Sequence, residues 1–327
     1  MTVDFHAHVI VPEITRDAAP DEEWRPRVYT DEDGGQLVEL GGGPIRSAVR
    51  EFVDVEGILA SVEAARVVLS PWVPLLFYDA EPEEGLRRCR IQNEALAEIA
   101  RAHPERVGAL GAVPLQDPAL AAAELGRLEL PGVEVAASVR GAYLGDDRFE
   151  EFWAAAEATG AVVFVHPTTR GFDVPALSDH YLWNSVGNPF ETTITAAHMV
   201  MTGVLERHPG LKVVLAHAGG ALLALRGRLR HAHRVVAAAG TRLAESPDES
   251  LRRFHYDTLT HDRDLLRALI EYVGAERVVL GSDYPFDMGD ERPAASVREC
   301  ALDPAAEQAI LSGNALRLLE GRKGAIV

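Results

Sequence analysis

Short apolar segments alternate with longer amphipathic segments along the whole chain. Segments such as AVVFV and KVVLA are apolar at every or nearly every position, which predicts strands that are buried on both faces of a parallel sheet. The alternation repeats eight times, and eight successive strand–helix units favour a closed (β/α)8 barrel of the α/β class over an open doubly wound sheet. The predicted strands are Val3–Ile10, Val67–Pro71, Val107–Val113, Val133–Ser138, Ala161–His166, Lys212–His217, Phe254–Thr258 and Arg277–Ser282.

The segments between these strands carry the residues expected at helix ends. One such segment is EPEEGLRRCRIQNEALAEIARAHPER. It begins with acidic residues and ends in arginine and histidine, as the helix dipole favours, and a proline lies close to its end. DDRFEEFWAAAEATG begins acidic and ends on a glycine stop. Residues Pro304–Leu319 are predicted to form one amphipathic C-terminal helix that packs against the barrel.

Two longer stretches interrupt the alternation. The first, at about residues 12–50, is rich in charged residues and glycine, and we expect it to form a small hairpin-bearing lid. The second, residues 168–189, contains Trp183, Asn184 and Asn188 and follows a predicted strand, so it is expected to cover a pocket at the strand ends. Neither stretch resembles a separate domain, and we predict a single barrel domain over residues 1–327.

Composition and charge limit the possible partners. Hydrophobic residues make up 47% of the 327 residues, enough for a large buried core. The formal net charge of −18 argues against nucleic acid and anionic membranes, but allows a small anionic substrate in a locally positive cleft. The sequence has no membrane-spanning apolar segment, no basic and apolar leader, and two cysteines that are too few for a disulfide framework. We therefore expect a soluble cytoplasmic protein.

Five side chains with metal-binding chemistry lie near the C-terminal ends of predicted strands. His6 and His8 are two residues apart on one strand, so both point to the same face. His166 and His217 end two further strands, and Asp283 follows the last one. Barrel enzymes carry their active sites at this rim. Three imidazoles and a carboxylate suit zinc, with manganese, iron or cobalt as alternatives, and leave one coordination position open for water. His217 is then not needed as a ligand.

The scarcity of lysine limits the number of metal ions. Binuclear hydrolase sites on this fold commonly contain a carbamylated lysine that bridges two metals. Only two of the 32 basic residues are lysines, Lys212 and Lys323. Lys212 opens a predicted strand at the wrong end of the barrel and Lys323 lies in the C-terminal tail, so we predict a single metal ion.

An ordered set of motifs runs along almost the whole chain. They are DFHAHVI, PEEGLRRCRIQNEALAEIA, RVGALGAVPLQDP, FVHP, VGNPFETT, ERHPGLKVVLAHAGG, GRLRH, YDTLTHD, LGSDYPF and SGNALRLL. The HxH pair alone is a weak signal, but the ordered set is specific. By these motifs the chain resembles the amidohydrolase superfamily, in the 2-amino-3-carboxymuconate 6-semialdehyde decarboxylase branch.

The resemblance implies a distorted (β/α)8 barrel with one divalent metal ion, usually zinc. It implies that the ligands are His6, His8, His166 and Asp283, with Asp283 also among the catalytic residues. His217 matches the family's catalytic base, which takes a proton from water activated by the metal.

The resemblance also implies a carboxylate substrate and a homodimer. Arg228 matches an arginine that contributes to carboxylate binding across a dimer interface, and its fork geometry suits a carboxylate. Arg46 or Arg50 matches a second substrate arginine, although the alignment needs a one-residue shift there, and we favour Arg46.

Departures from the family pattern concern the substrate. The family's active-site loop often has a tryptophan three residues before the glycine that matches Gly187, whereas this chain has Asn184 there and Trp183 beside it. We expect Trp183 and Asn184 to contact the substrate. Ala218 replaces a glycine directly after His217. A related carboxylic acid is therefore about as good a candidate as the muconate semialdehyde itself.

Three classes of function fit these residues. The first is a metal-dependent non-oxidative decarboxylase of an unsaturated or aromatic carboxylic acid. The second is a mononuclear hydrolase or hydratase that acts on a lactone, ester or enol acid, because the same metal and histidine can activate water for attack on a carbonyl. The third, a metal-binding protein without catalysis, is disfavoured because it leaves His217 without a role.

Overall fold

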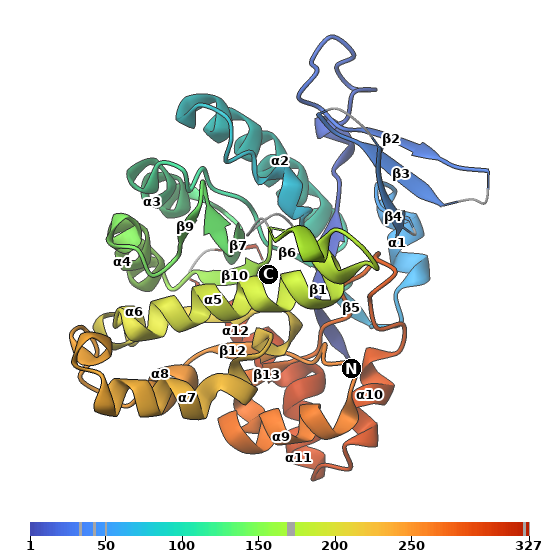
Figure 1. The fold of residues 1–327 in the computed structure, drawn as a ribbon. Helices are drawn as coiled ribbons and strands as arrows, with labels where there is room; N and C mark the ends of the chain where they lie inside the picture. Colours follow the sequence, from blue (N-terminus) through green and yellow to red (C-terminus); the bar gives the residue numbers. More distant parts are fainter. Residues whose placement is uncertain (33–34, 42–43, 50, 169–173, 323–324, 327) are drawn as a thin grey trace.

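The structure is a computed structural model. It describes residues 1–32, 35–41, 51–168, 174–322 and 325–326, and the backbone of residues 44–49 (Figure 1). No helix in these described parts is long and apolar enough to cross a membrane.

Eight parallel strands form the centre of the molecule, as the alternating pattern predicts. Pairing gives one sheet in the order β1-β5-β6 and another in the order β13-β12-β11-β10-β7. Parallel bridges from Gly111 to Val133 and from Ala7 to Tyr284 join the two sheets at both edges, which closes the barrel. The barrel strands are β1 (Val3–Val9), β5 (Arg66–Pro71), β6 (Val107–Ala109), β7 (Gly132–Ala136), β10 (Val162–His166), β11 (Lys212–Leu215), β12 (His255–Asp257) and β13 (Val278–Val279).

Several of these strands end earlier than the apolar pattern predicts. β11 ends at Leu215 rather than at His217, and β13 ends at Val279 rather than at Ser282. His217 and Asp283 both have a positive φ, 53° and 57°, so the backbone leaves the extended conformation where the chain reaches the rim. Regular pairing therefore stops where these polar residues begin.

Helices surround the barrel (Figure 1). The barrel interior contains Phe5 and Phe164, which pack with Leu318 and Leu319 of the C-terminal helix. The helices are α1 (Val55–Ser61), α2 (Pro82–Ala102), α3 (Pro118–Arg127), α4 (Glu150–Thr159), α5 (Asn188–Met201), α6 (Val204–Arg207), α7 (Leu222–Val235), α8 (Pro247–Leu251), α9 (Arg263–Val273), α10 (Pro293–Glu299), α11 (Pro304–Gln308) and α12 (Asn314–Glu320).

The predicted helix ends are confirmed for α2 and α4. α2 begins with Pro82 and two glutamates, and α4 stops at Gly160, whose φ of 67° provides a left-handed cap. The predicted single helix Pro304–Leu319 is instead α11, a π-helical turn at Ala309–Gly313 and α12. The sequence pattern does not distinguish this turn because its residues keep the apolar face continuous.

The stretch at about 12–50 contains a small antiparallel sheet beside the barrel (Figure 1). Its strands are β2 (Arg27–Thr30), β3 (Gln36–Glu39) and β4 (Pro44–Val49), in the order β2-β3-β4. A second short hairpin, β8 (Ser138–Val139) with β9 (Ala142–Tyr143), follows β7 and was not expected from the sequence.

Gly220 is expected to be essential for the packing of the loop after β11 against α5. Its φ is 65°, and a Cβ there would lie 1.9 Å from the carbonyl oxygen of Pro189. Gly220→Ala should therefore lower the free energy of unfolding by about 2–5 kcal/mol, measured by urea denaturation. The matched control is Gly227→Ala on α7, where a Cβ meets nothing within 4 Å, and this variant should be about 0.5–1 kcal/mol more stable than wild type. Equal stability of the two variants would contradict the prediction.

Candidate metal centre

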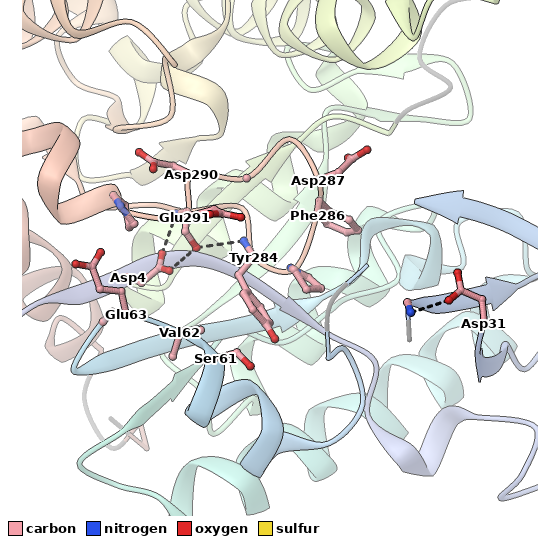
Figure 2. Close-up of a pocket in the computed structure, with 16 residues that line it drawn as sticks. Asp4, Asp31, Ser61, Val62, Glu63, Tyr284, Phe286, Asp287, Asp290 and Glu291 are labelled. Carbon is pink, nitrogen blue, oxygen red and sulfur yellow. Dashed lines mark hydrogen bonds between the residues drawn. The ribbon is translucent and has the colours of Figure 1, made fainter. Parts of the chain in front are cut away.

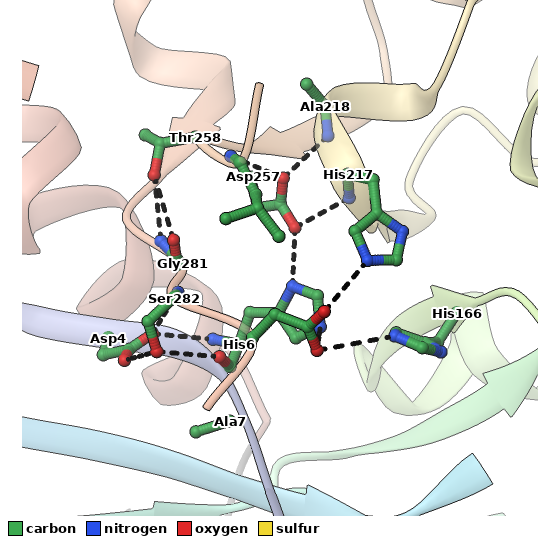
Figure 3. A network of polar contacts seen from close by, with 12 residues as sticks. Asp4, His6, Ala7, His166, His217, Ala218, Asp257, Thr258, Gly281 and Ser282 are labelled. Carbon is green, nitrogen blue, oxygen red and sulfur yellow. Dashed lines mark hydrogen bonds and ion pairs between the residues drawn. The ribbon is translucent and has the colours of Figure 1, made fainter. Parts of the chain in front are cut away.

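Five polar side chains converge at the C-terminal ends of the barrel strands. His6 and His8 lie late in β1, His166 ends β10, His217 follows β11, and Asp283 follows β13. Figure 3 shows His6, His166 and His217 turned toward one another. The rim positions inferred from the sequence are therefore brought together in space.

The carboxylate of Asp283 is at the centre of this group. Its Oδ1 lies 3.1 Å from Nε2 of His6, 3.2 Å from Nε2 of His8 and 3.9 Å from Nε2 of His166. Its Oδ2 lies 3.3 Å from Nε2 of His217. One ligand atom from each of His6, His166, His217 and Asp283 lies within 4.8 Å of the others, close enough to share one ion.

The donor set fits a divalent metal. His166 Nε2 and Asp283 Oδ1 are buried and have no hydrogen-bond partner among the described residues. The Nε2 atoms of His6 and His8 face each other at 3.2 Å. A buried polar atom without a partner is destabilising by about 1–3 kcal/mol, and a cation held between imidazole nitrogens and a carboxylate oxygen satisfies all of these atoms together.

Asp257 holds several parts of the centre in place, although the sequence analysis did not single it out. Its Oδ2 lies 2.7 Å from Nδ1 of His6 and accepts from the backbone N–H of His217 at 2.9 Å (Figure 3). Its Oδ1 accepts from the N–H of Ala218 at 2.7 Å and of Leu259 at 3.0 Å. A carboxylate behind a ligating imidazole fixes the ring orientation and the tautomer. The signal in the sequence that could have indicated Asp257 was its position near the end of a predicted strand.

Asp4 connects β1 to the segment that carries Asp283. It accepts from the N–H of His6 at 3.1 Å, from the N–H of Ser282 at 3.0 Å and from the Ser282 hydroxyl (Figure 3). Burial raises the pKa of Asp4 to about 6, although these hydrogen bonds oppose the shift. Asp4 therefore fixes a histidine ligand and the residue before Asp283 relative to each other.

The carboxylates draw positive charge to the centre. Burial lowers the pKa of His6, but Asp283 and Asp257 more than offset burial and raise the pKa to about 10. Burial also opposes ionisation of Asp283, yet His6, His166 and His217 hold the pKa of Asp283 well below its usual range. Burial lowers the pKa of His166 to about 4, so this ring is neutral and able to ligate. The carboxylates thus make the centre favourable for positive charge, whether a proton on His6 or a metal ion.

The backbone at the rim is strained where it presents these groups. His217 and Ala218 both have a φ of 53°, in the left-handed region that non-glycine residues rarely adopt. Each such residue is destabilised by roughly 1–2 kcal/mol. The hydrogen bonds from the N–H groups of His217 and Ala218 to Asp257 hold the strained turn. Strain of this kind clusters at functional sites.

A cavity of about 230 Å³ opens onto this centre. His217 and Asp283 line it, whereas His6 and His8 are fully buried beneath. Asn184, expected from the sequence to contact substrate, also lines the cavity. Trp183 does not line it, and its ring packs against Tyr181 with the ring centroids 4.9 Å apart. The other lining residues are Ser185, Asn188, Pro189, Ala218, Gly220, Leu259, Thr260, His261, Leu265 and Met288.

A larger cavity of about 610 Å³ lies on another side of β1 and does not fit an anionic substrate (Figure 2). Six carboxylates line it, and no lysine or arginine does so among the residues that the structure describes. The carboxylates belong to Asp4, Asp31, Glu63, Asp287, Asp290 and Glu291. Repulsion from these groups makes the smaller cavity the better place for a carboxylate.

Arg228, expected from the sequence to bind the substrate carboxylate, does not line the smaller cavity of the single chain. Arg228 lies on α7 and is exposed, and it makes no ion pair with the described residues. Arg46 lies on β4, of which only the backbone is described, and Arg50 lies outside the described residues. No arginine or lysine lines this cavity in the described part of the chain.

Comparisons with known proteins agree with this arrangement. The amidohydrolase family model matches residues 3–321. The 2-amino-3-carboxymuconate-6-semialdehyde decarboxylase of Dictyostelium discoideum is 32% identical over 259 residues, which cover 76% of this chain and 70% of the relative. The gamma-resorcylate decarboxylase of Rhodococcus jostii is 27% identical over 312 residues, covering 87% of this chain and 88% of the relative.

A solved structure agrees with the same grouping. The crystal structure of 5-carboxyvanillate decarboxylase from Sphingomonas paucimobilis superposes with a TM-score of 0.81 at 26% identity, covering 98% of this chain and 99% of that one. With the barrel, the rim histidines and the family match together, this chain belongs to the amidohydrolase family, in the branch that includes 2-amino-3-carboxymuconate-6-semialdehyde decarboxylase and related decarboxylases.

Proposed function

We propose that this protein is a metal-dependent non-oxidative decarboxylase of an unsaturated or aromatic carboxylic acid. The observation that carries the proposal is the convergence of four histidines and Asp283 beside a small cavity that, apart from Asp283, is lined by histidines and by apolar and uncharged polar residues. The named relatives, which are decarboxylases, support the same reaction class.

We infer that one divalent ion, with zinc as the first candidate, is held by His6, His8, His166 and Asp283. Manganese, iron and cobalt accept the same donors. The ion, when bound, polarises substrate oxygen and lowers the pKa of water. Lys212 begins β11, at the end of the barrel opposite the histidines, and so is too far away to bridge two ions there. Its position supports a single ion.

His217 is the candidate for proton transfer. It differs from His6 and His8 because its side chain is 13% exposed and lines the cavity, whereas theirs are fully buried. Asp283 Oδ2 lies 3.3 Å from His217 Nε2, close enough to orient the ring toward the cavity. His217 can take a proton from water and return it to the carbon that loses carbon dioxide, so that carboxylate and proton become carbon dioxide and a C–H bond.

We also infer that the substrate carboxylate meets Arg228 of a second copy of the chain in a homodimer. The exposed side chains of Val186, Phe190 and Ile194 recur every four residues at the start of α5 and along it, an apolar row that a second copy would cover. α5 packs against α7, which carries Arg228. We propose a cytoplasmic location for the dimer.

The reaction class is tested by incubating the metal-loaded protein with carboxylated substrates. The set contains 2-amino-3-carboxymuconate 6-semialdehyde, gamma-resorcylate and 5-carboxyvanillate, each with an ester or lactone of similar size. We expect release of one carbon dioxide per substrate consumed, measured by a coupled carbon dioxide assay and product mass. Turnover of an ester or lactone without carbon dioxide would instead favour the hydrolase or hydratase.

The division of roles among the histidines is tested by His217→Ala and His166→Ala. Wild type should contain about one divalent ion per chain by elemental analysis. His217→Ala should keep the ion and lose about 10²- to 10⁴-fold in kcat, because proton transfer is removed. His166→Ala should lose the ion. His231→Ala, at an exposed position of α7, is the control for both measurements. Loss of metal from His217→Ala would make His217 a ligand.

The role of Arg228 is tested by kinetics and sedimentation. Arg228→Ala should raise KM for a carboxylate about 10- to 100-fold with little change in unfolding temperature, because a charge-assisted contact is lost from an exposed position. Arg234→Ala, near the end of the same helix, is the control. Sedimentation should show a dimer for all three proteins. An unchanged KM in Arg228→Ala would remove Arg228 from the substrate site.

A further inference from the structure

Glu134 is a fully buried carboxylate inside the barrel. It lies in the middle of β7 and pairs in register with Phe164 of β10. Neighbouring residues in register on parallel strands point to the same face, and Phe164 packs in the barrel interior. The side chain of Glu134 therefore points into the barrel, below the rim that carries the metal centre.

Neither oxygen of Glu134 accepts a hydrogen bond from the residues that the structure describes. Asp257 differs in this respect, because it accepts from three backbone N–H groups besides its contact with His6. The hydroxyl of Tyr78 is also buried. Burial, and after it the neighbouring Cys89 and Glu134, raises the pKa of Tyr78 well above its ordinary value. The carboxyl group of Glu134 is thus buried without a hydrogen-bond donor among the described residues.

The positively polarised group nearest to this carboxylate is the ring of His8. Oε2 of Glu134 lies 3.5 Å from Nδ1 of His8, behind the ring atom that faces the centre. The hydroxyl of Ser70 and the carbonyl of Pro71 lie 3.3 and 3.4 Å from the same nitrogen. Three oxygens therefore surround Nδ1 of His8, and only that of Glu134 belongs to a carboxyl group.

A buried carboxylate without hydrogen bonds is strongly destabilising unless a cation offsets it. A divalent ion on Nε2 of His8 makes Nδ1–H a stronger donor, and the carboxylate then compensates part of the charge of the ion. Asp257 stands in the same relation to His6. Each imidazole of the HxH pair thus has a carboxylate behind it. Asp257, behind His6, also accepts hydrogen bonds from backbone N–H groups, whereas Glu134, behind His8, has only the ring of His8 beside it as a partner among the described residues.

We propose that Glu134 is a positioning residue that orients His8 and, through His8, strengthens the binding of the divalent ion. The proposal rests on the metal centre of the proposed function. It goes beyond that function because Glu134 does not line the substrate cavity, yet it is assigned part of the affinity for metal.

The test is Glu134→Gln, which keeps the shape and removes the charge. Zinc and manganese affinities are measured by competition with a chromophoric chelator, and unfolding temperatures are measured with excess metal and with excess chelator. We expect affinity to fall about 10- to 100-fold. Adding metal should raise the unfolding temperature of Glu134→Gln less than that of wild type, because the stabilisation by a bound ion follows its affinity.

Two controls separate this role from general stability. Glu124→Gln removes a buried glutamate on α3 that pairs with Arg90, away from the histidines, and should bind metal like wild type. Asp257→Asn should lower the unfolding temperature both with metal and in chelator, because three backbone donors lose a charged acceptor. Glu134→Gln should differ from Glu124→Gln in its affinity for metal.

The outcomes distinguish the inference from the proposed function. If wild type binds neither zinc nor manganese, the metal centre and the proposed function both fail. If wild type binds metal and Glu134→Gln binds it equally well, only the role of Glu134 is refuted. An equal rise in unfolding temperature on adding metal to both proteins would also refute it, because Glu134 would then contribute nothing to metal binding.

Discussion

The carboxylate of Asp257 is the contact on which the rest of the site depends. It lies at the end of β12 and reaches His6 on β1 and the backbone after β11, so three strands meet at one side chain. Without it, the left-handed turn at His217 would lack the acceptor that stabilises it, and Nδ1 of His6 would lose its carboxylate partner. The geometry of the site is thus a property of the closed barrel and not of any single loop.

Much of the fold could be predicted because it depends on periodic features. Eight apolar runs marked eight strands, and the positions of His6, His166 and Asp283 after such runs predicted one common rim. The hairpin β8–β9 could not be predicted in this way, because two-residue strands leave no periodic pattern. The early end of β13 at Val279 depends on tertiary contacts that apolar runs do not report.

The supporting carboxylates of the site were harder to find than the ligands. Asp257 resembles any acidic residue that ends a strand, and only the distance to His6 distinguishes it. Glu134 left a clearer signal, a single charge inside the apolar run GVEVA, and buried strands rarely contain one. For Arg228 the difficulty is different. The motifs indicated the residue, but its position on the surface of a helix does not show which cavity its side chain reaches.

The pairing between β1 and the segment around Asp283 has a consequence for biosynthesis. The N–H of Asp283 donates to the carbonyl of His6, and the N–H of His8 donates to the carbonyl of Tyr284, both at 2.8 Å. His6 and Asp283 therefore come from opposite ends of the chain, and a ribosome adds His6 long before it adds Asp283. The group of rim side chains is complete only when the last strand has joined the first, so an ion that needs both residues can bind only after the barrel has closed.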